Sequence, residues 1–265
     1  MEIPLLHRYF LRLSYNGTEY SGWQFQRNSI TIQQIINEKM TLLLREHIEV
    51  TGCGRTDAGV HASKFYAHFM SLKDDLDTDA KVLFRLNKIL PYAIAIQKIT
   101  KVPEKAHARF HAYSRTYEYH ICRVKDPFGP YLHWELTDLL NIDLMNEGAK
   151  ILLGYDDFIA FSKTSDVKTT ICKLTQSEWK IKIGEEGTAQ EGKAIGYVFT
   201  ITSNRFLRNM VRAIVGTLVD VGREKISLAD VHRIFESKER SQAGTSVPAQ
   251  GLFLKEVLYP KEFNL

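Results

Sequence analysis

The chain of 265 residues has few cysteines, and they are not arranged as structural cysteines usually are. Its three cysteines, Cys53, Cys122 and Cys172, are far apart and form no CxxC pair. An odd number of widely spaced cysteines argues against a disulfide framework and against a structural zinc site. It also indicates a reducing compartment, and we expect the cytoplasm.

The motifs of several common enzyme classes are also missing. There is no GxxxxGK[ST] loop and no GxGxxG after an expected strand, so the chain lacks the usual phosphate cradle. The GxSxG motif and the zinc-deaminase pattern are absent as well. His107 and His111 are four residues apart, but without the glutamate of HExxH they make a weak metal site. We expect an activity that uses no cofactor and no metal.

Long apolar segments are lacking too. No run of 18 apolar residues occurs, so the sequence predicts no membrane span. Residues 1–6 are too few for the apolar part of a signal peptide, and a strand expected from about Tyr9 leaves no room for a transit peptide. The net charge of +4 permits a polyanionic partner without requiring one.

Alternation and capping residues predict the order β-α-β-β-α-β in the first hundred residues, which is that of a ferredoxin-like fold. The expected strands cover residues 7–15, 48–51, 65–69 and 93–102. The first helix follows Thr31, which we expect to form a capping box with Gln34. The second helix begins after Thr78 or Asp79 and ends before Pro91.

The remaining sequence predicts a second α/β half, so we divide the chain into residues 1–103 and 104–265. Its expected strands are residues 115–122, 170–183, 194–203 and 252–259, and its expected helices are residues 143–153, 206–221 and 228–235. Between the two long strands, residues 184–193 (GEEGTAQEGK) predict a charged loop.

Residues 54–61 (GRTDAGVH) place Arg55 two positions before Asp57, and small residues follow. Gly59 tolerates a positive φ and an aspartate accepts bonds from nearby N–H groups, so this segment predicts a turn between two strands. In one interpretation Asp57 only shapes the turn and pairs with Arg55. In the other, a neighbouring guanidinium keeps the carboxylate ionised and the carboxylate acts as a nucleophile.

Two groups of arginines favour an anionic partner. Arg205, Arg208 and Arg212 have the spacing that places them on one face of the expected helix over residues 206–221. Positive charge near the start of a helix opposes its dipole, which a bound anion would offset. A solvated helix face is the alternative.

Arg109, Arg115 and Arg123 are interleaved with aromatic residues, a composition that suits RNA because guanidinium groups meet phosphates and rings stack on bases. Aromatic residues in strands also pack in cores, and this is our expectation for Phe110 and Tyr119. Tyr117 is the aromatic residue that we expect to face a site. One carboxylate, several arginines and a tyrosine suit chemistry on a nucleoside in RNA.

Five sequence blocks in order carry a resemblance to the tRNA pseudouridine synthase A family, almost from end to end. The blocks are YNGTEYSGWQ at 15–24 with Gln26 and TIQ at 31–33, GRTDAGVH at 54–61, ARFHA at 108–112 with SRTYEY at 114–119, FLRNMVRAIVG at 206–216, and GLFL at 251–254. The resemblance implies an α+β fold in which two RRM-like or ferredoxin-like halves form an extended, mostly antiparallel sheet. Helices cover one face, and a basic cleft lies at the centre.

The resemblance also implies a function. Family members isomerise uridine to pseudouridine at positions 38, 39 and 40, in the anticodon stem-loop of tRNA. They use no cofactor and no metal, and they act as homodimers in which the tRNA contacts both subunits.

The roles of single residues follow from the same resemblance. Asp57 matches the catalytic aspartate, which forms a covalent adduct while the base is detached and turned. Tyr117 matches the tyrosine that stacks on the target base, and Arg212 matches the arginine that pairs with the catalytic carboxylate. Arg55 is then available to hold the gap left by the flipped base, and Leu252 matches an apolar wall of the pocket.

We expect four further arginines to bind the RNA, namely Arg109, Arg115, Arg205 and Arg208. The sequence departs from the family pattern at two places. Asp156 stands where the family often has histidine, and Thr169 stands where arginine is frequent. The second change removes a possible phosphate contact and leaves the grip on the RNA open on that side.

Two other classes of function stay open at this point. A non-catalytic RNA-binding protein would need no Asp57, although the RNP1 signature is missing. A nucleoside or glycoside hydrolase would need a second carboxylate beside the bond that is cleaved. The sequence does not decide which uridines or RNAs are substrates, nor the order of the chemical steps at Asp57.

Overall fold

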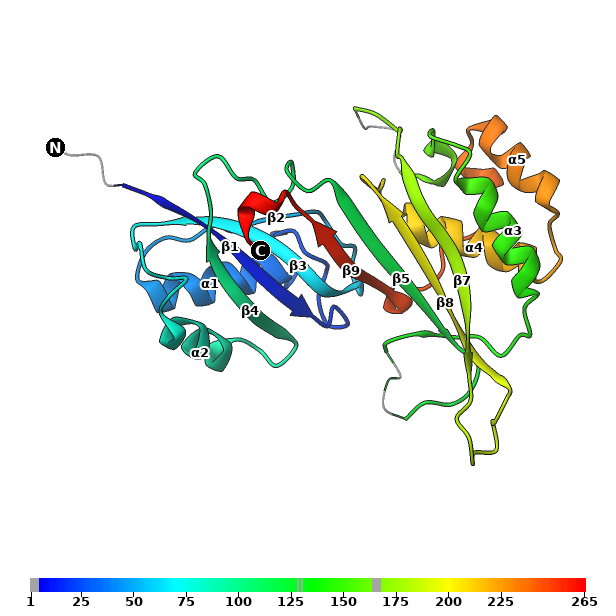
Figure 1. The fold of residues 1–265 in the computed structure, drawn as a ribbon, viewed down its shortest axis with the longest axis horizontal. Coiled ribbons are helices and arrows are strands. Elements are labelled where there is room, and N and C mark those ends of the chain that lie inside the picture. The colour runs from blue at the N-terminus through cyan, green and yellow to red at the C-terminus, as the bar shows by residue number, and fades with distance from the viewer. Residues whose placement is uncertain (1–4, 128, 130, 164–167) are drawn as a thin grey trace. The chain divides into compact units, whose positions relative to one another are not determined.

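The computed structural model describes residues 5–127, 129, 131–163 and 168–265. Within them the chain is a mixed α/β protein with five α-helices and nine strands in a mostly antiparallel sheet (Figure 1), which confirms the predicted fold class. It divides into two compact units, residues 1–115 with 254–265, and residues 116–253. The domain division at residues 103 and 104 stays a prediction.

The first unit has the predicted order of elements. They are β1 (His7–Tyr15), α1 (Ile32–Leu44), β2 (Thr51–Gly52), β3 (His61–Ser71), α2 (Ala80–Ile89) and β4 (Ile94–Lys101), joined by most of β9 (Leu252–Leu258). Strand β1 lies between β3 and β4 and is antiparallel to both, so that Tyr9 is opposite Phe69 on one side and Lys101 on the other. Strand β9 follows β3 in the strand order.

The strand expected over residues 48–51 is largely wrong, because only its last residue lies in β2. The backbone N–H groups of Ile48 and Val50 donate to side chains of α1, namely to Thr41 Oγ1 at 3.1 Å and to Asn37 Oδ1 at 2.9 Å. The helix therefore satisfies N–H groups that a sheet would otherwise pair.

In the first unit the helix starts are close to those predicted. Thr31 caps α1, and its side chain accepts a hydrogen bond from the Gln34 N–H at 3.3 Å. The Gln34 amide donates to Glu38 Oε1 at 2.9 Å rather than back to the cap, so only half of the expected capping box forms. Asp79 caps α2 in the same way.

Both faces of β1 are buried within the first unit. Tyr9, Leu11 and Leu13 are fully buried on one face. On the other face, the Phe10 ring meets the rings of Tyr259 and Phe263 edge to face, with centroid distances of 5.4 and 5.8 Å. The C-terminal segment of the chain therefore completes the core of the first unit.

His68 of β3 lies in this core with 8% of its surface exposed. Its Nδ1 accepts a hydrogen bond from the Ala108 N–H at 3.2 Å, and its ring lies 4.5 Å from that of His107. Burial, together with the nearby charges of His107 and Arg8, lowers the pKa of His68 to about 4. The imidazole is thus neutral in the folded protein at pH 5 and above.

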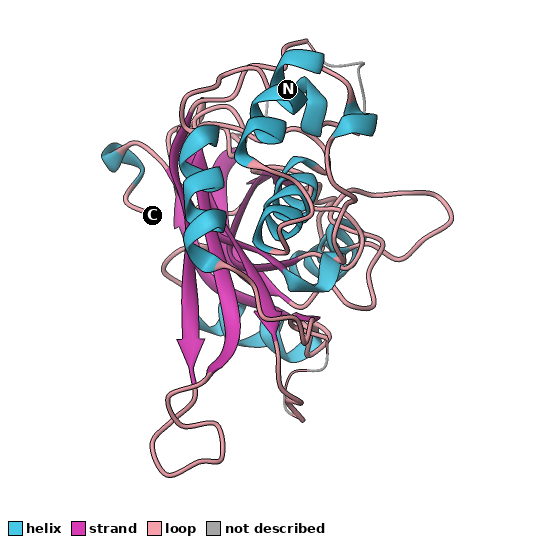
Figure 2. Cartoon of the chain, turned by 90° about the vertical axis from the view of Figure 1, so that its right-hand side faces the viewer, coloured by secondary structure: helices cyan, strands magenta, loops and turns pink. Residues whose placement is uncertain are grey.

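The second unit contains β5 (Ser114–Cys122, from its third residue), β6 (Trp134–Glu135), α3 (Ile142–Leu152), β7 (Leu174–Ile183), β8 (Ala194–Ser203), α4 (Met210–Gly222) and α5 (Leu228–Ser237). Strand β8 lies between β5 and β7, and β6 is parallel to β5. Helix α3 contacts β7, α4 and α5, and Figure 2 shows these helices beside the long strands. None of the described helices is long and apolar enough to cross a membrane.

The helix expected over residues 206–221 begins later than predicted. Its first four residues are not helical, and α4 starts only after Asn209, whose φ of 66° is left-handed. Arg205 and Arg208 therefore precede the helix, and only Arg212 lies in it. The prediction that the three arginines share one helix face is wrong, because the left-handed residue interrupts the spacing.

The strand expected from residue 170 begins only at Leu174. Residues 170–172 are instead hydrogen-bonded to residues 156–158. The Phe158 N–H donates to the Thr170 carbonyl at 3.2 Å. The Cys172 N–H donates to the Asp156 carbonyl at 2.8 Å.

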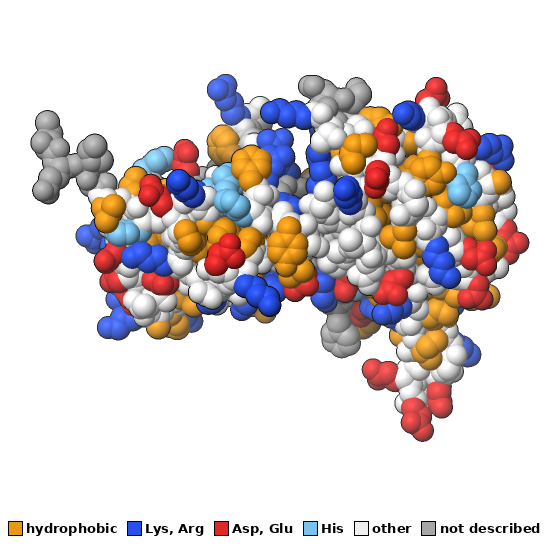
Figure 3. All heavy atoms as spheres, turned by 45° about the horizontal axis from the view of Figure 1, so that its top comes forward, with side chains coloured by type: hydrophobic (Ala, Val, Ile, Leu, Met, Phe, Trp, Pro, Cys, Tyr) orange, Lys and Arg blue, Asp and Glu red, His pale blue; other side chains and the backbone are white. Residues whose placement is uncertain are grey.

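Predictions for three smaller features have different outcomes. Tyr119 is fully buried as expected, but Phe110 is 74% exposed and is not a core residue. The three cysteines are free thiols. Residues 184–193 form the predicted loop, in which Glu185, Glu186 and Glu191 are exposed. Figure 3 shows acidic side chains gathered at the end of a projection of the surface.

The depressed pKa of His68 makes stability depend on pH. An unfolded histidine has a pKa near 6.5, so between that value and about 4 the unfolded chain binds the proton more readily than the folded one. The free energy of unfolding should fall as the pH is lowered through this window, with a loss of about 2 kcal/mol at pH 5 from this residue.

The variant His68→Asn, whose amide oxygen replaces the Nδ1 acceptor, should lose that part of the pH dependence. Urea unfolding at pH 7 and pH 5 measures the difference in both proteins. An equal loss of stability in the variant would show that His68 is not its source.

Candidate active site

Residues 54–61, which we call the Asp57 loop, connect β2 to β3 as predicted. Asp57 is partly exposed and Arg55 is exposed. The Val60 N–H donates to the Asp57 carbonyl at 3.1 Å, and Gly59 has a φ of +77°. The predicted turn is therefore confirmed, whereas a pairing of Asp57 with Arg55 stays a prediction. The turn leaves the Asp57 side chain partly exposed.

The loop after β1, residues 16–24, lies against the Asp57 loop, and we call it the N-terminal loop. Three hydrogen bonds join the two: Trp23 N–H to Thr56 O at 3.1 Å, Gly59 N–H to Tyr20 O at 3.3 Å, and Gly17 N–H to His61 Nδ1 at 3.0 Å. The sequence blocks YNGTEYSGWQ and GRTDAGVH therefore form one structural element.

Thr56 holds the Asp57 loop from the side of the core. Its Oγ1 shares a hydrogen bond of 2.8 Å with the Tyr15 hydroxyl, and only 6% of Thr56 is exposed. Next to them, the Trp23 ring packs on the Phe65 ring with a centroid distance of 4.1 Å. A buried hydrogen bond and packed rings leave the residue before Asp57 little freedom.

Gly22 allows the two loops to approach each other closely. Its φ is +88°, and a Cβ atom there would lie 2.5 Å from the Thr56 carbonyl oxygen and 3.1 Å from the Asp57 carbonyl carbon. Any side chain would press on the backbone that carries the carboxylate. The sequence patterns did not single out this glycine, although it lies within the first block.

Arg115, the second residue of β5, belongs to the first unit. Its guanidinium donates to the carbonyl oxygens of Cys53, Arg109 and Ala112. The structure thus brings together Arg115 and Arg109, which we both predicted to bind substrate. They differ in exposure, because Arg109 is exposed and Arg115 is only partly exposed.

The other predicted site residues lie in the second unit. The Tyr117 ring is half-buried and meets the Phe206 ring edge to face, at a centroid distance of 5.1 Å. Leu252 is buried at the start of β9. Arg208 is exposed in the turn before α4, and Arg205 is half-buried there.

Arg212 is anchored to the segment that leads into β9. Its Nε donates to the Val247 carbonyl at 2.6 Å, and the Val247 N–H donates back to the Arg212 carbonyl at 3.3 Å. The next residue, Pro248, accepts a hydrogen bond of 2.8 Å from the Tyr119 hydroxyl, whose pKa is raised by burial. A Cβ at Gly251 would lie 2.7 Å from the Tyr119 ring. The segment and the arginine thus hold each other in place.

The histidines of the ARFHA block stabilise a turn. His111 Nδ1 accepts a hydrogen bond from the His107 N–H at 2.9 Å, and His107 Nδ1 accepts one from the Arg109 N–H at 3.1 Å. Their spacing is therefore explained by the turn. Among the residues that the structure describes, no group of three histidine, cysteine or acidic side chains is placed to hold a metal.

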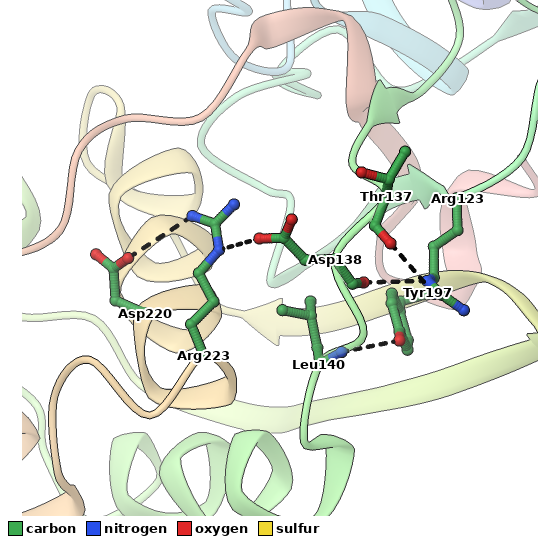
Figure 4. Close-up of polar contacts among 7 residues, drawn as sticks. All are labelled: Arg123, Thr137, Asp138, Leu140, Tyr197, Asp220 and Arg223. Carbon is green, nitrogen blue, oxygen red and sulfur yellow. Dashed lines mark hydrogen bonds and ion pairs between the residues drawn. The ribbon is translucent and has the colours of Figure 1, made fainter.

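Arg123, which the aromatic pattern also indicated, is committed to the fold of the second unit (Figure 4). It donates to the carbonyls of Thr137 at 3.2 Å and Asp138 at 3.0 Å, as drawn in Figure 4. It also donates to the Ala194 carbonyl at 2.6 Å. Arg223 binds the Asp138 carboxylate at 2.5 Å in the same network. These bonds fix the segment before α3, so Arg123 has a structural role.

Comparison with known proteins agrees with these blocks. A family model described as tRNA pseudouridine synthase matches residues 149–260. Proteins named tRNA pseudouridine synthase A from Bacteroides fragilis and Parabacteroides distasonis are 48% and 45% identical, each over 97% of this chain and 98% of their own length. One from Clostridium acetobutylicum is 39% identical over 94% of this chain and 98% of its own length.

The chain belongs to the tRNA pseudouridine synthase A family. The resemblance found in the five blocks is thereby confirmed, and the match extends over both units.

For a member of this family, several supporting residues were missed by the sequence patterns. They are Tyr15, Gly22, Trp23 and Thr56, which hold the Asp57 loop. The unusual density of aromatic residues and glycines in residues 15–23 is the signal that could have revealed them. Such a composition suits a backbone that must pass close to another chain segment.

We predict that Gly22→Ala is strongly destabilising, because the new methyl group meets the Asp57 loop. Gly187→Ala is the matched control, since Gly187 also has a positive φ, of +76°, but open space around its Cβ position. A left-handed alanine costs about 1–2 kcal/mol at either position. At Gly22 we expect at least ~1 kcal/mol more, from the displaced backbone.

Urea unfolding of both variants gives the two losses. Equal destabilisation would show that the contact between the loops is not tight in solution.

Proposed function

We propose that this protein isomerises uridine to pseudouridine at positions 38, 39 and 40, in the anticodon stem-loop of tRNA, with Asp57 as the nucleophile. The coarser activity, uridine isomerisation in tRNA, follows from its family. The observation that carries the finer proposal is the clamped Asp57 loop, which presents one partly exposed carboxylate from a fixed backbone.

A fixed carboxylate suits a reaction in which one bond is exchanged for another. We propose that Asp57 forms a covalent adduct while the N1 glycosidic bond of uridine breaks and the uracil turns. The bond to Asp57 then breaks, C5 of the base is joined to the ribose, the hydrogen of C5 is released to solvent, and N1 takes up a proton. A nucleophile of this kind divides one difficult step into two easier ones.

The target base must leave its stack to reach Asp57, at a cost of a few kcal/mol. Arg55 is exposed two residues away in the same loop, and we propose that it holds the position that the base has left. In this proposal Tyr117 stacks on the flipped base. Its ring is held in place by the edge-to-face contact with the Phe206 ring. Leu252 supplies an apolar wall of the pocket, and Arg212 keeps the catalytic carboxylate ionised.

We propose that three arginines outside the helices bind the tRNA away from the target base. Arg109 and Arg208 are exposed and Arg205 is half-exposed, so we propose that they bind phosphates. The exposed glutamates of the loop over residues 184–193 would repel phosphates, so we assign no RNA contact to this loop. From the resemblance we also expect a homodimer acting in the cytoplasm, with tRNA contacting both subunits.

The nucleophile is tested with tRNA that carries tritium at C5 of uridine. We predict that Asp57→Asn and Asp57→Ala bind this tRNA but release no tritium, because the covalent adduct cannot form. Asp74→Asn removes an exposed carboxylate elsewhere in the first unit and should release tritium at the wild-type rate.

The same assay decides between the classes of function that the sequence left open. If the unmutated protein only binds RNA, it releases no tritium. If it is a hydrolase, it liberates free uracil. Turnover retained in Asp57→Asn would refute the proposed nucleophile.

For Arg212→Ala we predict a loss of turnover of at least tenfold with less than about threefold loss of tRNA affinity. The reason is that Arg212 is anchored by Val247 and acts on the reacting groups in this proposal. Affinity for tRNA measured from low to high salt provides the contrast. The salt slope is the slope of the logarithm of the tRNA binding constant against the logarithm of the salt concentration. A large loss of affinity, together with a salt slope whose magnitude is reduced by about one, would identify Arg212 as a phosphate contact instead.

A further inference from the structure

We propose that Arg115 is a positioning residue for the Asp57 loop, and that it is not one of the arginines that bind phosphate. This inference rests on the proposed function, because it assumes that Asp57 carries out the reaction. It also revises our expectation from the sequence, where the alternation of arginines and aromatic residues placed Arg115 among the substrate-binding residues.

The contacts of the guanidinium are the first reason. One terminal nitrogen, Nη1, donates to the Ala112 carbonyl at 3.0 Å. The other, Nη2, donates both to the Cys53 carbonyl at 3.1 Å and to the Arg109 carbonyl at 2.7 Å. A charged donor strengthens such bonds, and the planar fork of arginine fits several acceptors at once. Arg115 thus connects two segments that are more than fifty residues apart.

The position of Cys53 is the second reason. It directly precedes the Asp57 loop and is buried, and burial raises the pKa of its thiol to about 11. Its N–H donates to the Tyr66 carbonyl of β3 at 2.8 Å, while its carbonyl accepts the bond from Arg115. The peptide that leads into the loop is therefore held on both sides. The N-terminal loop fixes the part around Thr56 and Gly59, and Arg115 fixes the entrance.

The turn over residues 108–112 is also bonded to the core of the first unit. The Tyr259 hydroxyl donates to the Ala108 carbonyl at 2.5 Å, and the Ala108 N–H donates to His68 at 3.2 Å. Arg115 is thus anchored to a rigid turn, and through it the core of the first unit determines where the Asp57 loop begins. In the fold, Arg115 of the SRTYEY block thus joins the ARFHA block to the residue before GRTDAGVH.

The substitutions Arg115→Lys and Arg115→Gln separate positioning from phosphate binding. Lysine keeps the charge but cannot reach three carbonyls with a planar fork, so a positioning role predicts that both variants are impaired. A phosphate contact would be largely retained by lysine and lost with glutamine. Arg85→Gln, which removes an exposed arginine of α2, is the matched control for the loss of one charge.

We measure kcat and KM for tritium release, and tRNA affinity as a function of salt. We expect kcat to fall at least tenfold in both Arg115 variants, while tRNA affinity changes less than about threefold and the salt slope stays at its wild-type value. The proposal is overturned if Arg115→Lys has wild-type kcat, or if Arg115→Gln loses affinity with a slope reduced by about one.

Tyr259→Phe provides a milder second variant in case the Arg115 variants fold poorly. It removes one hydrogen bond to the turn over residues 108–112 and leaves all arginines in place. We expect a lower kcat with an unchanged salt slope, and a wild-type kcat would contradict the proposal. If Asp57→Asn retains turnover, the proposed function itself has failed. If Asp57→Asn is inactive and the Arg115 variants are fully active, only the positioning role is wrong.

Discussion

The close contact between the N-terminal loop and the Asp57 loop is the constraint on which the candidate active site depends. The Trp23 N–H binds the Thr56 carbonyl, and the Thr56 hydroxyl is bound by Tyr15 in the core. Gly22 makes this approach possible because it has no side chain to strike the backbone of Asp57. A nucleophile on a flexible loop would lose much of its advantage to entropy, so a backbone held at several points is what this chemistry needs.

The arginines show how one residue type serves two purposes. Arg115 and Arg123 donate to backbone carbonyls and stabilise the chain, in the first and in the second unit respectively. Arg55, Arg109 and Arg208 are exposed and suited to bind RNA. Arg109, Arg115 and Arg123 look alike in the sequence, because all three stand among aromatic residues. Burial and the direction of the guanidinium distinguish them, and only folding determines these properties.

Much of the fold could be predicted because local signals agreed with one another. Strand β1 alternates over its whole length, and Asp79 and Thr31 are good helix caps, so these elements lie where expected. The prediction was wrong where tertiary contacts replaced a local preference. Side chains of α1 bind the backbone before β2, and a left-handed Asn209 delays α4 although an apolar stripe continues upstream of it.

The family, the order of elements, and the loop with its carboxylate can be read from the sequence, because they depend on residue types at fixed local spacing. What holds that loop became visible only in the folded chain. Residues 15–24 and Arg115 are distant from Asp57 along the chain, and hydrogen bonds between such segments leave no periodic trace in a sequence. For the same reason Arg205 and Arg208 were assigned to a helix that they precede, since spacing alone does not show where a backbone turns.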